Sequence, residues 1–531
     1  MYSKMSDSSM DESALEEKKG NEYLRQSKFG ESIVCYSKAI NLCDVSNEKR
    51  ISRLYANRAS ANLKVNRYYS VIDDATHSFM LDKKYSEPLY YRYMARVALG
   101  QYNEALVDIT AVCMLEKEEV REHVTRRTEL LINLSTKRAH ESKRNLPKLR
   151  VHGMNVKEYF KDFKNHALFD ESYDSEKLTK FISNLENTPN VENKDAKMYL
   201  TEATISFLRG DWTAAETLAE QAVRSVQHDT KLKITAMIHL ANSIMLSPTA
   251  ILESVSTAAV LKIYEDAIVM DKNNVDIYLH RAMCYFQLQL FDKALTDLQR
   301  CIALDATFES AYLLKLNAHY ALEEMKDLNG VKKVFKQFEK YIGVHPHSID
   351  APIQYSNLLH QSGKAEKAAN IISKALKLNP DNSDLLKEKA EFLIEKDPQA
   401  ARPLLLKALP STNVYKRELF AMMAFVAAEH GEFNEALIYS DKAISETRNE
   451  NDLLSCILRR EKLSSILYAC NLLGIEANKE NCSSVIKQLA IRKKKLTSHK
   501  QALFAHIPSL SNEIDDVLFG FYIQLYFASL F

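Results

Sequence analysis

The sequence has few of the residues that interrupt helices, because only eleven glycines and eleven prolines occur among 531 residues. This scarcity favours a helical chain over one with many strands and tight turns. No two glycines lie closer than ten residues, which excludes the glycine-rich loops that hold phosphates in nucleotide-binding proteins. Gly-x-Ser-x-Gly, His-Glu-x-x-His and zinc-binding spacings are also missing. We therefore expect a protein that is not an enzyme, with no catalytic residues, no metal site and no cofactor.

Neither sign of charge dominates the chain, since 71 Lys and Arg residues face 70 Asp and Glu residues, for a formal net charge of +1. Sequence-independent nucleic-acid binding needs a large basic surface, so this balance argues against nucleic acid as a partner. The eight cysteines are scattered without a Cys-x-x-Cys pair, which is typical of reduced, mostly buried thiols in a cytosolic setting. The first seventeen residues are polar and acidic, and they have no apolar core of a signal peptide.

A helical pattern with a 34-residue period runs along most of the chain. Its clearest copy lies between Ser86 and Glu116, where apolar residues recur at helical spacing on both sides of Gly100. This pattern predicts two antiparallel helices joined by a tight turn. About ten copies follow one another, with small residues where two helices touch and aromatic residues between them. We therefore predict an all-α tetratricopeptide-repeat superhelix, an α-solenoid in two arrays of about three and seven repeats.

The position of the repeats and the changes in composition divide the chain into five segments. They are a disordered N-terminus (1–12), a three-repeat module with a charged end helix (13–144), a linker (145–175), a C-terminal superhelix (176–474) and a tail (475–531). In the linker, we expect the aromatic side chains of Tyr159, Phe160 and Phe163 to dock onto a neighbouring helix. The last fifteen residues, from Val517 to Phe531, are almost wholly apolar. A membrane helix needs about 17–25 such residues, so this end is either a terminal helix packed on the solenoid or a short tail anchor.

A solenoid binds its partners along the concave groove that the first helix of each repeat lines. Counting from each repeat start, positions 2, 5, 9 and 12 of the first helix face this groove, and two of these starts lie near 275 and 309. In the second array, apolar residues at these positions predict a trough for extended or helical apolar peptides. The alternative is that some of them pack inside the chain. The predicted groove residues are Leu200, Phe207, Leu279, Met283, Phe286, Leu313, Tyr320, Ile353 and Phe425.

Four phrases in the first three repeats resemble the seventy-kilodalton import receptors of the mitochondrial outer membrane: residues 19–23, 35–40, 57–59 and 108–116. The order of three repeats, end helix, linker and about seven more repeats is also similar, over residues 13–474. The resemblance implies a receptor that binds hydrophobic or carrier-type mitochondrial preproteins in the second array and works with the other outer-membrane translocase subunits. It implies a place at the cytosolic face of the mitochondrial outer membrane, although no anchor is evident in the sequence and the cytosol is the alternative.

In the same family, the N-terminal module binds the acidic C-terminal tail of heat-shock chaperones through a clamp of two asparagines, two lysines and one arginine. Asn21 and Asn57 match the two asparagines, whereas Glu17, Glu87 and Tyr91 stand at the three cationic positions. Because glutamates repel an acidic tail, the clamp is degenerate and we expect chaperone binding to be weak. Three nearby arginines could compensate in part: Arg25, Arg53 and Arg92.

Two other functions stay open at this point. A soluble tetratricopeptide co-chaperone adaptor would need a working clamp, which the residues at the cationic positions disfavour. A regulatory subunit of an enzyme is disfavoured because the tail after Gly474 is too short for a catalytic domain and contains no catalytic motif.

Overall fold

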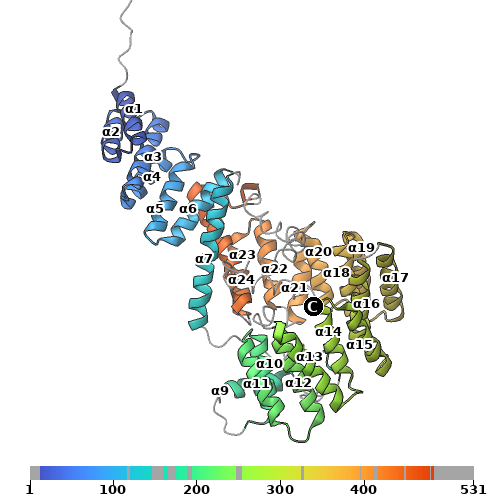
Figure 1. The fold of residues 1–531 in the computed structure, drawn as a ribbon. Helices are drawn as coiled ribbons and strands as arrows, with labels where there is room; N and C mark the ends of the chain where they lie inside the picture. The colour runs from blue at the N-terminus through green and yellow to red at the C-terminus, as the bar shows by residue number, and fades with distance from the viewer. Residues whose placement is uncertain are drawn as a thin grey trace, which may run out of the picture. The chain divides into compact units, whose positions relative to one another are not determined.

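A computed structural model describes the structure of most of the chain, in residues 12–116, 120–145, 159–164, 175–187, 194–246, 254–324, 328–394, 396–411, 416–447, 450–478 and 480–482. Every regular element in these residues is a helix, which confirms the all-α prediction (Figure 1). The N-terminus predicted as disordered, most of the predicted linker and the apolar end from Val517 to Phe531 lie outside the described residues.

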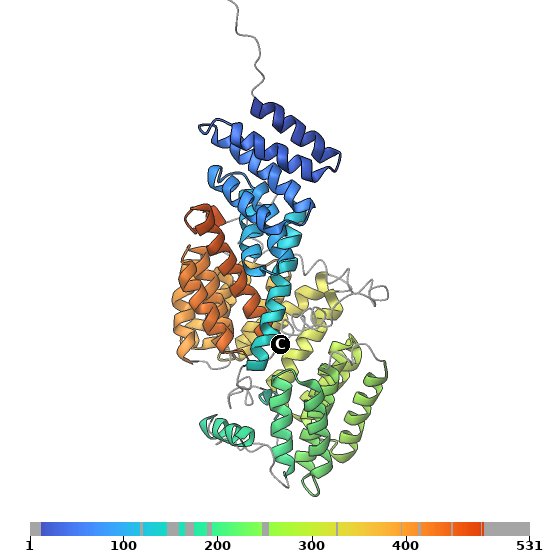
Figure 2. The same ribbon diagram turned by 90° about the vertical axis from the view of Figure 1, so that its left-hand side faces the viewer.

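The first six helices form three antiparallel pairs, which follow one another in sequence order (Figure 2). They are α1 (Glu12–Arg25) with α2 (Phe29–Leu42), α3 (Glu48–Lys64) with α4 (Tyr68–Leu81), and α5 (Glu87–Ala98) with α6 (Tyr102–Leu115), followed by the long helix α7 (Arg121–Asn145). In each turn between paired helices one residue has a left-handed backbone: Ser27, Asn66 and Gly100, with φ of 58°, 57° and 74°. Such a residue ends the first helix and lets the chain reverse.

Seven further pairs follow in the second part of the described chain, after the short helix α9 (Ser175–Asn187). Their bounds are α10 (Ala196–Leu208), α11 (Trp212–Ser225), α12 (Thr230–Leu246), α13 (Ser254–Met270), α14 (Val275–Gln287), α15 (Phe291–Leu304), α16 (Glu309–Glu324), α17 (Leu328–Val344), α18 (Asp350–Gln361), α19 (Ala365–Leu378), α20 (Ser383–Ile394), α21 (Pro398–Ala408), α22 (Lys416–Glu429) and α23 (Phe433–Ser445). A 3₁₀ turn (Leu409–Ser411) follows α21, and α24 (Glu450–Leu473) follows the last pair.

Small residues and buried ion pairs hold the two helices of a repeat together. A Cβ atom at Gly20 of α1 would lie 2.8 Å from the Tyr36 ring of α2, so only glycine lets these helices approach so closely. In three repeats an arginine of the first helix donates to an aspartate sixteen residues later on the second. The pairs are Arg58–Asp74, Arg92–Asp108 and Arg281–Asp297.

The chain divides into two compact units. Unit 1 holds residues 1–145, 427–441 and 454–514, and its largest apolar cluster joins α4–α7 to α23 and α24. Unit 2 holds residues 146–426, 442–453 and 515–531.

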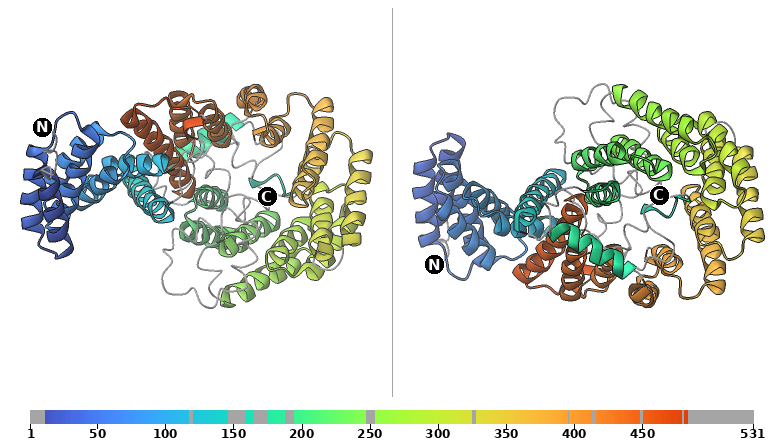
Figure 3. Two further views of the ribbon diagram at one scale, coloured as in Figure 1. Left: turned by 90° about the horizontal axis from the view of Figure 1, so that it is seen from above. Right: turned by 90° about the horizontal axis from the view of Figure 1, so that it is seen from below.

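In unit 2 the helix pairs follow a curved row, seen end-on in Figure 3. The first helices α10, α12, α14 and α16 contact one another directly, so they form one continuous surface, which we call the first-helix face. No helix among the described residues is both long enough and apolar enough to cross a membrane.

Candidate functional site

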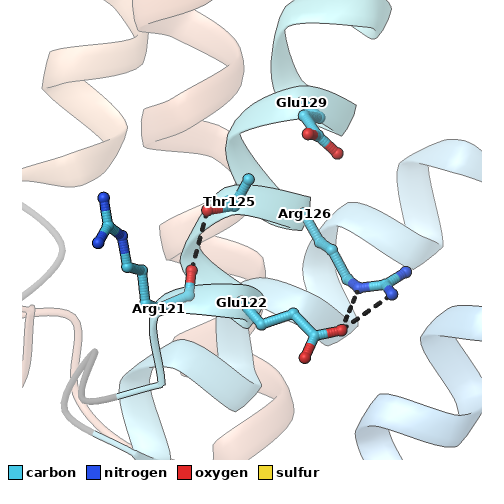
Figure 4. Close-up of a pocket in the computed structure, with 5 residues that line it drawn as sticks. All are labelled: Arg121, Glu122, Thr125, Arg126 and Glu129. Carbon is cyan, nitrogen blue, oxygen red and sulfur yellow. Dashed lines mark hydrogen bonds and ion pairs between the residues drawn. The ribbon is translucent and has the colours of Figure 1, made fainter.

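A shallow hollow of about 540 Å³ lies along the start of α7 and is lined by Arg121, Glu122, Thr125, Arg126 and Glu129 (Figure 4). Two of its four charged side chains are paired with each other, because Arg126 donates two hydrogen bonds to Glu122, and the Thr125 hydroxyl donates to the Arg121 carbonyl oxygen. All five lining residues come from this one helix. We therefore looked for a site on the surfaces that the first helices form.

In the N-terminal module, the residues at the predicted clamp positions lie on the first helices α1, α3 and α5. The Asn21 side-chain oxygen accepts a hydrogen bond of 2.7 Å from the Tyr36 hydroxyl, and Asn57 is half-buried on α3. Glu17 pairs with Arg50 at 3.5 Å. One asparagine therefore has a partner inside its own repeat, and one glutamate at a cationic position has its charge balanced.

Glu87, at the second lysine position, accepts hydrogen bonds from two tyrosine hydroxyls, at 2.5 Å from Tyr85 and at 2.6 Å from Tyr91. Burial, together with the hydrogen bond to Glu87, raises the pKa of both phenols well above the ordinary tyrosine value. The hydroxyls therefore stay protonated and act as donors to the carboxylate. Glu87 and Tyr91, at the second lysine position and the arginine position, are therefore hydrogen-bonded to each other and offer no positive charge to an incoming carboxylate.

Arg92, one of the three nearby arginines, is already paired inside its own repeat. Its guanidinium is buried and donates to both carboxylate oxygens of Asp108 and to the Thr76 hydroxyl. Removing Arg92 from this pair would leave the buried Asp108 carboxylate short of a partner, so its charge is not available to a ligand. Arg53, another of the three nearby arginines, is exposed on α3.

In the second array the residues predicted to line the groove fall into two sets. Leu200, Leu279, Leu313 and Tyr320 are buried in the apolar clusters between helices. The other five are half-buried on first helices, and they present part of their apolar surface outside the core: Phe207, Met283, Phe286, Ile353 and Phe425.

The first-helix face carries a segment of the chain itself, residues 159–164, which we call the docked segment. Figure 3 shows this short teal segment on the inner side of the curved row. Tyr159 packs edge-on against Phe207 of α10 with 5.1 Å between ring centroids, and it lies 5.1 Å from the ring of His239 on α12. Phe163 lies 4.1 Å from the ring of His280 on α14. Phe160 and Phe163 are buried, so the predicted docking of the linker aromatics onto a helix is confirmed.

Polar contacts extend the docked segment from α14 to α16. The Lys164 backbone N–H donates to Asp276 at 2.7 Å, and Ser310 donates to Asp162 at 2.7 Å. The Lys164 ammonium group donates to Thr307 at 3.0 Å and forms an ion pair with Asp305. This hydrogen-bonded ammonium lowers the pKa of Asp305 to about 2.

Two of these contact residues lie at positions that the repeat numbering had marked. Counted from the repeat starts near 275 and 309, Asp276 and Ser310 are both at position 2 of a first helix. Neither residue was predicted to line the groove, because the predicted trough consists of apolar residues only. His239 and His280 gave no comparable signal, because the aromatic rings that contact them come from the linker.

These features define the class of the protein. Antiparallel helix pairs, left-handed turn residues and a continuous first-helix face are the architecture of a tetratricopeptide-repeat protein. The family model described as Tetratricopeptide repeat matches residues 275–308 and 353–382.

Known proteins narrow the class further, since the chain is a TOM70-like tetratricopeptide-repeat protein. It is 25% identical over 481 residues to mitochondrial import receptor subunit TOM70 of Rattus norvegicus, which covers 84% of this chain and 78% of the relative. It is 23% identical over 450 residues to the TOM70 subunit of Saccharomyces cerevisiae, covering 68% and 70%. A crystal structure of yeast Tom70 aligns with 85% of this chain and 95% of that chain, at 18% identity and a TM-score of 0.40.

Proposed function

We propose that this chain is a non-enzymatic receptor for mitochondrial preproteins of the hydrophobic or carrier type, acting at the cytosolic face of the mitochondrial outer membrane. The observation that carries the proposal is the similarity to TOM70 import receptor subunits along 84% of the chain, which extends through both arrays. A receptor needs surface for a polypeptide and no reaction centre. The first helices α10, α12, α14 and α16 of unit 2 offer such a surface, because they contact one another directly.

The proposed preprotein surface in unit 2 is made by the half-buried groove residues. Phe207, Met283, Phe286, Ile353 and Phe425 expose part of their apolar side chains on first helices, and the flexible methionine can adapt to different sequences. The buried residues Leu200, Leu279 and Leu313 pack in the apolar clusters between the helices. Their part in binding is therefore indirect, because they fix the spacing of the exposed aromatic side chains.

Chaperone tails are a weaker proposed partner than preproteins. Glu17 is paired with Arg50, and the Glu87 carboxylate accepts from two neutral tyrosine hydroxyls, so the residues at the cationic clamp positions supply no positive charge. A terminal carboxylate gains most from charged donors, which these positions do not supply.

Binding of a purified carrier-type preprotein to the full chain tests the proposed function. The preprotein is kept soluble in mild detergent, labelled, and titrated with the chain, alongside a soluble cytosolic protein of similar size as the control. We expect saturable binding of the preprotein in the micromolar range or tighter, about −8 kcal/mol, and no saturation with the control. Equal binding of both, or of neither, would contradict the proposal. Imaging of a tagged chain in cells tests the location separately.

A further inference from the structure

The docked segment has the features of a bound peptide ligand. Its two anchoring rings, Tyr159 and Phe163, are four residues apart and contact three different first helices. Its charged groups have matched partners, since Asp162 accepts from Ser310 and Lys164 binds Asp305 and Thr307. Each of these contacts joins residues more than one hundred positions apart in unit 2, except those of Tyr159 with α10 and α12. The surface of the array thus holds the segment through both its rings and its polar groups.

The fit of the docked segment leaves polar groups of the array incompletely paired. His239 and His280 are almost fully buried beside the aromatic rings, and the Nε2 atom of each has no hydrogen-bond partner among the described residues. Their Nδ1 atoms lie 3.2 Å from the Ser243 hydroxyl and 3.4 Å from the Asn242 amide. Buried polar atoms without partners cost free energy. A ligand that brings a hydrogen-bonding group to these nitrogen atoms would therefore bind more tightly than the docked segment does.

We propose that the surface formed by α10, α12, α14 and α16 is a peptide-binding site. It accepts, in place of the docked segment, a foreign polypeptide stretch with two aromatic side chains four residues apart, a carboxylate between them and a lysine directly after the second ring. The docked segment then competes with the foreign polypeptide for this site. This inference deepens the proposed function, and it rests on that function only in taking the foreign stretch to be part of a preprotein.

Competition within one chain sets the expected size of the effect. A tethered segment acts at an effective concentration on the order of millimolar, so it fills the site most of the time unless its own affinity is very low. A foreign peptide then sees only the free fraction of the sites, and its apparent dissociation constant rises by the inverse of that fraction. If the segment is docked more than about 90% of the time, releasing it should strengthen peptide binding at least tenfold.

The test uses a fluorescent peptide with the sequence of residues 156–167, titrated by anisotropy with the full chain. The released chain carries Phe160→Ala and Phe163→Ala, which remove two buried rings from the docked segment and leave the array unchanged. The control is Val269→Ala, which alters a residue of α13 that is 87% exposed. We expect the released chain to bind the peptide at least tenfold more tightly than the wild type, and the control to bind like the wild type. A peptide with both phenylalanines replaced by alanine should bind neither chain.

Two further variants guard against a loss of folding. Lys164→Ala keeps both rings but removes the contacts to Asp305 and Thr307, and it should strengthen peptide binding in the same direction by a smaller factor. Adding His280→Ala to the released chain should weaken peptide binding again, because the His280 ring contacts Phe163. Circular-dichroism melts establish that each variant is folded. Equal peptide binding by wild-type chain, released chain and Lys164→Ala chain, or no binding by any of them, overturns the proposal.

The same proteins separate this inference from the proposed function. If the released chain binds the peptide tightly and no form binds a carrier-type preprotein, the peptide site stands and the receptor function fails. If preproteins bind the wild type and the released chain equally while the peptide binds neither, the receptor function stands and the inference fails.

Discussion

The ring of Phe163 lies 4.1 Å, centroid to centroid, from the imidazole ring of His280. One residue comes from the linker and the other from the middle of α14, so the contact ties the docked segment to the face of the array. It also removes His280 from water, and Tyr159 does the same for His239 on α12. Burial lowers the pKa of both histidines to about 3.

We therefore expect the stability of unit 2 to fall as the pH drops below about 6.5. In the unfolded chain both histidines bind protons near their ordinary pKa, whereas the folded state keeps them neutral down to a pKa of about 3. The unfolded state thus binds more protons between pH 6.5 and pH 3, and each histidine costs at most about 1.4 kcal/mol of unfolding free energy per pH unit in that window.

Urea unfolding at pH 7.0 and at pH 5.5 measures this loss. A chain with His239→Gln and His280→Gln is the control, because glutamine keeps a polar side chain that does not titrate. The control should show a clearly smaller difference between the two pH values. An identical difference in both chains would show that the two histidines do not cause the pH dependence.

The Arg92–Asp108 pair should be important for the stability of unit 1. Arg92 Nη2 lies 2.7 Å from Asp108 Oδ1, and both side chains are almost fully buried, so Arg92→Ala would leave the carboxylate with one arginine, Arg96, at its edge. Loss of one partner of a buried pair costs about 3–5 kcal/mol. Chemical denaturation measures the change.

The equivalent pair Arg58–Asp74 is the matched control for that variant. The Arg58 side chain is 22% exposed against 5% for Arg92, so Arg58→Ala should destabilise the chain clearly less. Equal losses for the two variants would mean that burial does not set the strength of these repeated pairs.

Chaperone-tail binding should be weak in this chain and should improve when the clamp positions regain their charges. We expect the full chain to bind a peptide ending in Glu-Glu-Val-Asp poorly, and the change Glu17→Lys, Glu87→Lys, Tyr91→Arg to strengthen it at least tenfold, about 1.4 kcal/mol. The reason is that charged donors would replace two carboxylates that repel the peptide. Titration calorimetry at moderate salt is the measurement.

The same three substitutions on the second helices provide the control. Glu31→Lys, Glu104→Lys and Tyr69→Arg alter three exposed residues of α2, α6 and α4, and they change the net charge by the same amount. They should leave peptide binding nearly unchanged. Tight binding by the unmodified chain would show that the degenerate clamp works without its cationic residues.

Periodicity predicts much of this fold and only part of the candidate site. The helices follow from apolar spacing and from turn residues such as Gly100, because each repeat is a local unit whose pattern is complete within 34 residues. The docking of Phe160 and Phe163 could be predicted from their apolar character, but not the helices that receive them. The polar contacts of the segment join residues 112 to 148 positions apart, which no local pattern encodes. Leu279 is at a groove-facing position of the repeat, but it is fully buried because it packs in one apolar cluster with residues of α15 and α16.

The proposed receptor function depends most directly on the half-buried apolar surface of α14. Phe286 packs edge-on against Phe291, at 5.2 Å between ring centroids, and is part of the proposed preprotein surface together with Met283. A carboxylate introduced there would have to lose its water when apolar cargo binds. Val269 of α13 offers a matched control, since it is an apolar residue on a second helix with 87% of its surface exposed.

The decisive measurement is the affinity of a carrier-type preprotein for the wild-type chain and for the Met283→Asp, Phe286→Asp and Val269→Asp variants, each with a circular-dichroism melt. We predict that either of the first two changes weakens binding at least tenfold, about 1.4 kcal/mol, with only a small shift in the melt, and that Val269→Asp has no effect. Unchanged preprotein binding by a folded Phe286→Asp chain, or a cooperative loss of helix in that variant, would contradict the account.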